Sequence, residues 1–145
     1  MRRIVLCDLD GTLANVDHRL HHIKDGNNDW DAFFGTSSAD TPIEPVIEMV
    51  RALAAAGHAI HILSGRREDA RADTEEWLAR HEVPYERLVM RGLHDHTPDD
   101  DLKRGWVEAD YDLGEILLAV EDRNMVVNMY RALGLVCVQV APGGF

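Results

Sequence analysis

Acidic and hydroxyl side chains gather near the start of the chain, in the segment Asp8-Leu9-Asp10-Gly11-Thr12. Other polar residues follow later apolar stretches: Ser64-Gly65-Arg66, Lys103 and the pair Glu121-Asp122. Clustered carboxylates alone would repel a phosphate group, but a divalent cation held between them would attract one. Mg²⁺ prefers such oxygen ligands and leaves positions for water and a substrate phosphate. These residue types therefore indicate phosphoryl chemistry at a metal site.

Each residue type suits one part of that chemistry. A carboxylate that faces phosphorus can attack it and form an aspartyl-phosphate. A second, protonated carboxylate can give its proton to the leaving alcohol and later activate water. Lys103 and Ser64 can hold the other phosphoryl oxygens and neutralise the charge spread over them in the transition state.

The hydrophobic pattern predicts the elements that bring these residues together. Short apolar runs predict buried strands over residues 4–7, 59–63, 88–90, 116–120 and 136–140. Helical spacing predicts helices over residues 45–56, 69–81, 99–109 and 124–133. This alternation implies right-handed crossovers, so we expect an α/β fold, a three-layer, doubly wound, Rossmann-like parallel sheet of about five strands.

The reactive residues stand where these predicted strands end. Asp8 follows the first strand, Ser64 the second and Glu121 the fourth, while the third strand contributes less clearly. The helix over 99–109 begins among acidic residues and carries Lys103. Ligands of open parallel sheets bind beyond the carboxyl ends of the strands. The sequence therefore predicts a single site at that edge.

Composition narrows the class of protein. The chain has 145 residues, 46 % of them hydrophobic, so we expect one domain over residues 1–145. Its net charge of −11 argues against bulk nucleic-acid binding, which needs a basic face. We expect no membrane segment and no signal peptide, because the apolar runs are too short. Cys7 and Cys137 lie far apart in apolar runs, which is typical of reduced core cysteines in a cytoplasmic protein.

In this order the motifs resemble those of the haloacid dehalogenase (HAD) superfamily of phosphotransferases, whose first motif looks like Asp8-Leu9-Asp10-Gly11-Thr12. The other three motifs look like Ser64, Lys103 and Glu121-Asp122. The resemblance narrows to the 3′-phosphatase domain of phage-type polynucleotide kinase/phosphatase and covers nearly the whole chain. That narrowing depends on Ser64-Gly65-Arg66, residues 84–91, Asp99-Asp100 before Lys103, and residues 139–145.

The resemblance implies roles for the matching residues. Asp8 would be the nucleophile and Asp10 the general acid and base. Mg²⁺ would be held by the Asp8 carboxylate, the Asp10 backbone carbonyl, Glu121 and Asp122. Lys103 would bind phosphate and complete the catalytic set. The substrate-binding positions would be Thr12, Arg19, Ser64, Gly65, Arg66 and Asp99.

The chain departs from the resembled family in two places. Glu121 stands where that branch usually has aspartate, which leaves the metal geometry at this position open. Residues 18–40 are longer than in kinase-linked domains, and we expect a small cap or lid there. Its aromatic residues Trp30, Phe33 and Phe34 suit either base stacking or packing onto the core. No G-x-x-x-x-G-K-[ST] segment occurs, so we expect no kinase half.

Two classes of function remain open. The first is a Mg²⁺-dependent phosphomonoesterase for nucleotide phosphates, foremost at 3′-phosphate ends of nucleic acid. Because the net charge predicts poor affinity for polyanions, a mononucleotide phosphatase is the alternative enzyme. The second class is a receiver-like phospho-acceptor module. Asp10 argues against it, since a module that keeps its phosphoryl group needs no general acid, and receivers place the acceptor on a later strand.

Overall fold

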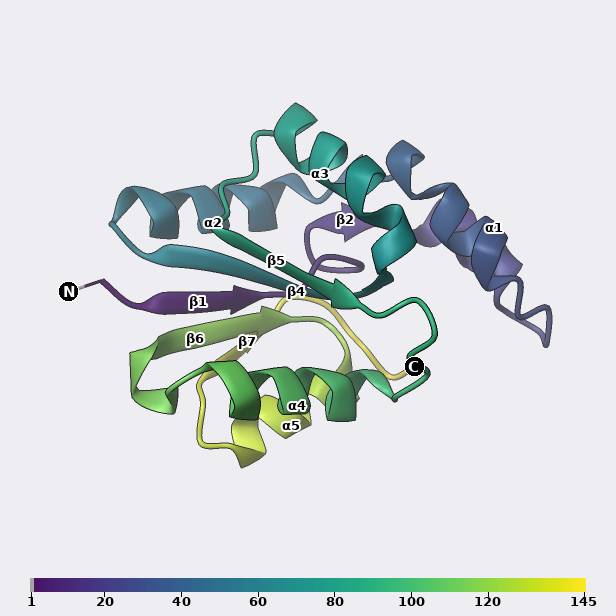
Figure 1. Ribbon diagram of the computed structural model, residues 1–145. Helices are drawn as coiled ribbons and strands as arrows, with labels where there is room; N and C mark the ends of the chain where they lie inside the picture. The colour runs from purple at the N-terminus through teal and green to yellow at the C-terminus, as the bar shows by residue number, and fades with distance from the viewer. Residues whose placement is uncertain (1) are drawn as a thin grey trace.

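A parallel sheet runs through the centre of the computed structural model, which describes residues 2–145 (Figure 1). Its strands lie in the order β5-β4-β1-β6-β7, and every neighbouring pair is parallel. The bounds are β1 (Ile4–Cys7), β4 (Ala59–Arg67), β5 (Arg87–Arg91), β6 (Ile116–Glu121) and β7 (Cys137–Gln139). The predicted α/β fold with a five-stranded parallel sheet is confirmed.

Helices cover both faces of this sheet. On one face lie α2 (Glu44–Ala55) and α3 (Arg71–Arg80), and on the other α4 (Asp99–Asp110) and α5 (Asn124–Ala132) (Figure 1). Successive β1 side chains alternate between the two cores, as the pleat requires. Val5 and Cys7 pack with α2 and α3, whereas Leu6 packs with α4 and α5. The first strand is therefore buried on both sides, which fixes the position of the residues that follow it.

One strand is longer than predicted. β4 continues from Ala59 to Arg67, so Ser64, Gly65 and Arg66 lie inside the strand and not after it. The pairing with β5 is irregular there, because the register shifts between Ser64 and Arg67. Such an irregularity re-aims side chains at a strand end. The expectation that the strand stops at residue 63 is therefore wrong, although the segment still lies at the carboxyl end of β4.

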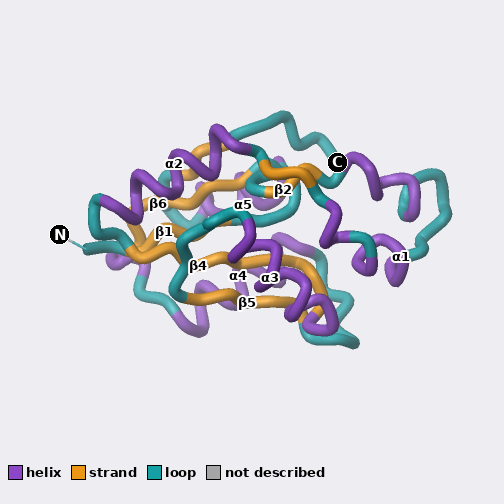
Figure 2. The backbone as a smooth tube through the Cα atoms, turned by 90° about the horizontal axis from the view of Figure 1, so that it is seen from above, coloured by secondary structure: helices purple, strands orange, loops and turns teal. Residues whose placement is uncertain are grey.

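The stretch between β1 and α2 forms an additional lobe at the carboxyl ends of the strands. Its base is the antiparallel pair β2 (Ala14–Asn15) and β3 (Thr41–Pro42). Between them lie a 3₁₀ turn over Asp17–His22 and the short helix α1 (Trp30–Gly35). Figures 1 and 2 show α1 beyond the ends of the central strands. The predicted cap, residues 18–40, falls on this lobe, and its action as a cap stays a prediction.

Both cysteines are buried and carry free thiols. Within residues 2–145, no helix has the length and apolarity needed to span a membrane.

Candidate active site

A cavity of about 950 Å³ lies at the carboxyl edge of the sheet, and its lining includes the four carboxylates that the motifs singled out, Asp8, Asp10, Glu121 and Asp122. Asp8 follows β1 directly, and Glu121 is the last residue of the neighbouring strand β6. Because β1 and β6 are parallel neighbours, their carboxyl ends meet at the same edge. The topology thus joins motifs that are more than a hundred residues apart in sequence.

Asp8, Glu121 and Asp122 form an acidic cluster around one lysine. Carboxylate oxygens of the three residues lie within 4.8 Å of one another. Lys103 Nζ, from α4, donates to Asp8 Oδ1 at 2.7 Å and to Glu121 Oε2 at 2.9 Å. Thr12 Oγ1 donates to Asp8 Oδ2 at 3.0 Å. All of these residues are buried, so one ammonium group faces three carboxylates with little solvent between them.

Burial raises the pKa values of all three carboxylates in this acidic cluster. Burial, reinforced by Glu121, raises the pKa of Asp8 to about 8. Burial and the nearby Asp8 raise the pKa of Asp122 to about 7. Burial also raises the pKa of Glu121, against the opposing effect of Lys103. A cation between these groups would restore their ionised forms. The donor set, all carboxylate oxygens, is the one that Mg²⁺ prefers.

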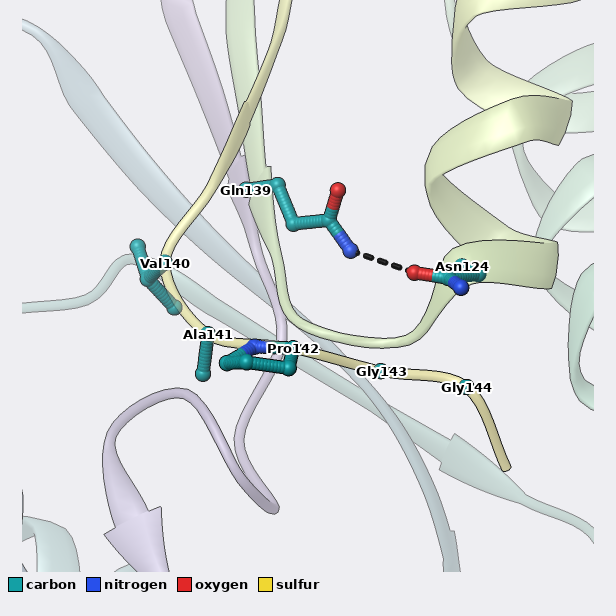
Figure 3. A pocket seen from close by; sticks show the side chains of 7 residues that line it. All are labelled: Asn124, Gln139, Val140, Ala141, Pro142, Gly143 and Gly144. Atoms are coloured by element: carbon teal, nitrogen blue, oxygen red, sulfur yellow. Dashed lines mark hydrogen bonds between the residues drawn. The ribbon is translucent and has the colours of Figure 1, made fainter.

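Gly11 allows the loop after β1 to approach the Asp122 carboxylate closely. Gly11 has φ +80°, a left-handed conformation, and a Cβ there would collide with the Asp122 carboxylate. Gln139 of β7 points toward Asn124, the first residue of α5, which follows the loop that carries Asp122 (Figure 3). Gln139 Nε2 donates to the Asp122 carbonyl at 2.9 Å and to Asn124 Oδ1 at 2.6 Å. The position of Asp122 is therefore fixed by backbone contacts as well as by its carboxylate.

Asp10 belongs to a separate arginine network, which consists of Arg19, Arg66, Asp10 and Asp40. Arg19 Nη2 donates to Asp10 Oδ1 and to Asp40 Oδ2, both at 2.8 Å. Arg66 Nη2 donates to the same two oxygens at 2.7 and 2.9 Å. Each guanidinium also has one further partner, Phe33 O for Arg19 and Thr74 Oγ1 for Arg66. Both arginines are fully enclosed and saturated, so they fix Asp10 in place.

The arginine network reverses the usual effect of burial on Asp10. Burial raises its pKa, but Arg66 and Arg19 outweigh that effect and leave the pKa below the ordinary value. The two carboxylates therefore have pKa shifts of opposite direction, lowered for Asp10 and raised for Asp8.

A third set of charged residues lies where the cavity opens to solvent. Asp99 opens α4 and accepts from Arg91 Nη2 at 2.7 Å and from Arg123 Nη1 at 3.2 Å. Arg91 Nε also donates to the Gly65 carbonyl at 2.9 Å, which ties β5 to β4. A Cβ at Gly65 would lie 2.6 Å from Asp99 Oδ1, so only glycine allows this approach. The side chains of Asp99, Arg91 and Arg123 all line the cavity.

The predicted site residues therefore divide into two groups. Gly65 and Asp99 line the cavity beside the four carboxylates. The others are buried and do not line it, and they are Thr12, Arg19, Ser64, Arg66 and Lys103. Ser64 Oγ accepts from the Arg66 amide at 3.1 Å. Direct contact of this second group with a substrate stays a prediction.

Two contributors lie outside the predicted set. Asp40 completes the arginine network, and its sequence neighbours resemble an ordinary polar loop, so nothing in the sequence marks it. Arg91 ends β5. Asp8 and Glu121 were identified because ligands of parallel sheets bind at the carboxyl ends of the strands. The same reasoning, applied to the third predicted strand, would have identified Arg91.

Comparison with known proteins agrees with this geometry. The pattern of the family described as the polynucleotide kinase PNKP phosphatase domain matches residues 2–145. The chain belongs to this family. It is accordingly a HAD-type phosphatase, and the resemblance read from its motifs is confirmed.

Two solved structures illustrate the similarity. A chain of the Pnkp1/Rnl/Hen1 complex is 31 % identical with a TM-score of 0.83, and the match covers 99 % of this chain and 47 % of that one. This chain therefore spans about half the length of that relative. The class C acid phosphatase from Bacillus anthracis with tungstate bound is 19 % identical with a TM-score of 0.65, over 99 % of this chain and 67 % of that one. At 19 % identity, this structural similarity shows a shared fold alone.

Proposed function

We propose that this phosphatase is a Mg²⁺-dependent phosphomonoesterase for nucleotide phosphates that works through an aspartyl-phosphate, and that its substrates are 3′-phosphate ends of nucleic acid. One observation carries the proposal. Two carboxylates, two residues apart, line the same cavity with different partners: Asp8 accepts from Lys103 at 2.7 Å within the acidic cluster, whereas Asp10 is held by two arginines. A carboxylate beside a buried ammonium group suits attack on phosphorus, and a second carboxylate in the same cavity suits proton transfer.

Asp8 is the nucleophile and Asp10 the general acid and base in this proposal. An Asp8 oxygen forms a bond to phosphorus, the bond from phosphorus to the leaving oxygen breaks, and Asp10 transfers a proton taken up from solvent to that oxygen. The arginines favour ionised Asp10 and so favour release of this proton. In the second step Asp10 accepts a proton from water, the water oxygen bonds to phosphorus, and the bond to Asp8 breaks.

Lys103 and the hydroxyl groups of Thr12 and Ser64 support the reaction at Asp8. Lys103 keeps its positive charge, because Asp8 and Glu121 raise its pKa more than burial lowers it. This charge, 2.7 Å from Asp8 Oδ1, suits stabilisation of phosphoryl oxygens carried by that side chain.

The acidic cluster fits the proposed magnesium ion. Asp8, Glu121 and Asp122 would hold it together with the Asp10 backbone carbonyl, and the excess negative charge of the cluster supports a divalent cation. Bound there, Mg²⁺ would neutralise charge on the phosphoryl oxygens.

Two facts support nucleic-acid ends as the substrate. The family is that of polynucleotide kinase phosphatase domains, and a 31 % identical chain, with a TM-score of 0.82, belongs to a Pnkp1/Rnl/Hen1 RNA repair complex. The net charge of −11 favours the alternative, a mononucleotide phosphatase.

A phosphate-release panel at fixed salt and Mg²⁺ tests the proposal. It compares 3′- and 5′-mononucleotides, matched oligonucleotides with a 3′- or a 5′-phosphate, and β-glycerol phosphate. We expect the highest kcat/KM for the 3′-phosphorylated oligonucleotide. Equal values for 3′-mononucleotide and oligonucleotide would favour the mononucleotide phosphatase. Values for all nucleotides equal to that of β-glycerol phosphate would refute nucleotide specificity altogether.

A further inference from the structure

The cavity at the active site extends well beyond the carboxylates. At about 950 Å³ it lies in the size range of pockets that hold whole small molecules and exceeds what a phosphate group fills. One part of its lining is apolar and comes from the lobe between β1 and α2. That part includes three aromatic residues of α1, which are Trp30, Phe33 and Phe34.

These aromatic residues differ sharply in exposure. Phe33 and Phe34 are 6 % and 8 % exposed and anchor α1 to the protein, whereas Trp30 is 47 % exposed. The Trp30 ring contacts both anchors, with centroids 5.6 Å from Phe33 and 6.0 Å from Phe34. Packing of α1 therefore depends on the two phenylalanines. The Trp30 indole, half in solvent and in the lining of the cavity that also holds Asp8 and Asp10, is available for a ligand.

The position of α1 is fixed relative to the sheet. Arg67, the last residue of β4, pairs with Asp31 of α1 at 2.8 Å and places its guanidinium 5.2 Å from the Phe34 ring. Arg19, which holds Asp10, also donates to the Phe33 carbonyl at 3.1 Å and lies 4.3 Å from the Phe33 ring. Arg19 thus holds both Asp10 and the helix that carries Trp30, and Arg67 ties the same helix to β4.

We propose that Trp30 is a stacking platform for the base of the nucleotide whose phosphate is held at Asp8, so that it makes the enzyme prefer base-bearing phosphate ends over abasic ones. This inference rests on the proposed function. Aromatic stacking is tolerant of base identity and does not depend on charge. It therefore suits a protein whose net charge of −11 denies it affinity from general phosphate contacts.

A matched substrate pair isolates this contact. Both are 3′-phosphorylated single-stranded oligonucleotides of one sequence, and in one of them the terminal nucleotide lacks its base. We expect the wild type to favour the base-bearing substrate about tenfold in kcat/KM, the range typical of one stacked base, through KM. Trp30→Ala lowers this ratio to about one, and Trp30→Phe, which keeps an aromatic ring, retains most of it.

Leu113→Ala is the matched control, because Leu113 is a similarly exposed apolar residue (42 %) that does not line the cavity. It leaves the ratio unchanged. A ratio that persists in Trp30→Ala overturns the inference. So does an equal loss on both substrates with no change in the ratio, since Trp30 would then only position α1. If the wild type hydrolyses both oligonucleotides no faster than β-glycerol phosphate, the proposed function itself fails.

Discussion

Asp8 lies among acidic side chains, whereas Asp10, two residues further along the same loop, lies between two arginines. With every group ionised, the acidic cluster has three carboxylates against Lys103 alone, an excess of two negative charges. The arginine network has two carboxylates against two guanidinium groups, with the His18 ring nitrogen 2.6 Å from Asp40 Oδ1 at its edge. The first region therefore suits a divalent cation, whereas the second carries its own counter-charges.

This difference in charge balance suits the two regions to different roles in the site. A region with unbalanced negative charge suits a cation, and burial together with repulsion between neighbouring carboxylates raises the pKa values of Asp8 and Asp122. A region that carries its own counter-charges can hold one carboxylate in a fixed place and ionisation state. Variants that disturb one region and spare the other test this division.

Among variants that keep the nucleophile Asp8, removing the charge of Asp10 has the largest expected effect. Asp10→Asn lowers kcat about 10²- to 10⁴-fold, because a general acid and base is lost, while KM changes little. Steady-state kinetics on the 3′-phosphorylated oligonucleotide measures it, with Asp17→Asn as the control. Asp17 is an exposed carboxylate that lines the same cavity. Equal losses in the two variants would show that the cavity needs only general negative charge at its rim.

Removing the charge of Asp40 destabilises the arginine network. Asp40→Asn leaves two enclosed guanidinium groups with one carboxylate, and breaking a buried ion pair costs about 3–5 kcal/mol. Urea denaturation measures the free energy of unfolding. Asp73→Asn, on the exposed side of α3, is expected to change it by less than about 0.5 kcal/mol. An unfolding free energy for Asp40→Asn as high as that of the wild type would mean that the network does not need Asp40.

The acidic cluster predicts an effect that depends on pH. Asp8 has a pKa of about 8 in the folded protein and an ordinary value of 3.8, so the folded state keeps a proton that the unfolded state releases. Its contribution to stability is therefore fully present below pH 4 and is lost as pH rises toward 8, by up to about 1.4 kcal/mol per pH unit.

Without Mg²⁺, the wild type thus loses more stability between pH 5 and pH 8 than Asp8→Asn does, as thermal unfolding in EDTA measures. Added Mg²⁺ raises the melting temperature more at pH 8 than at pH 5, because it needs the ionised carboxylates. Parallel pH profiles for the wild type and Asp8→Asn would show that the cluster carries no such excess charge.

The sequence predicted the sheet and the acidic cluster because both depend on local signals. A β-branched run followed at once by Asp8 marks a strand end, and the parallel topology then brings that end to Glu121. Helix bounds came within two residues for the same reason, since Pro45 and Gly57 mark the limits of α2.

The arginine network was only half predicted. Arg19 and Arg66 were expected to contact substrate, and the structure encloses both around Asp10 and Asp40 instead of placing them in the cavity lining. Asp40 lies in a lobe without hydrophobic periodicity, and the contact that fixes it, from Trp77 Nε1 to its carbonyl, spans 37 residues. Local patterns carry no information on such a pairing. Local patterns likewise do not show whether Trp30 packs onto the core or is free for base stacking. The two roles differ in the exposure of its side chain, which only the fold determines.

The central claim is that Asp8 accepts the phosphoryl group, and a structure with Mg²⁺ and beryllium fluoride tests it most directly. The account predicts the fluoride adduct on an Asp8 carboxylate oxygen, close to Lys103, with the cation among Asp8, Glu121 and Asp122, and it predicts no turnover by Asp8→Asn. An adduct on Asp10 or on any other residue, or an Asp8→Asn enzyme that still turns over, would contradict it.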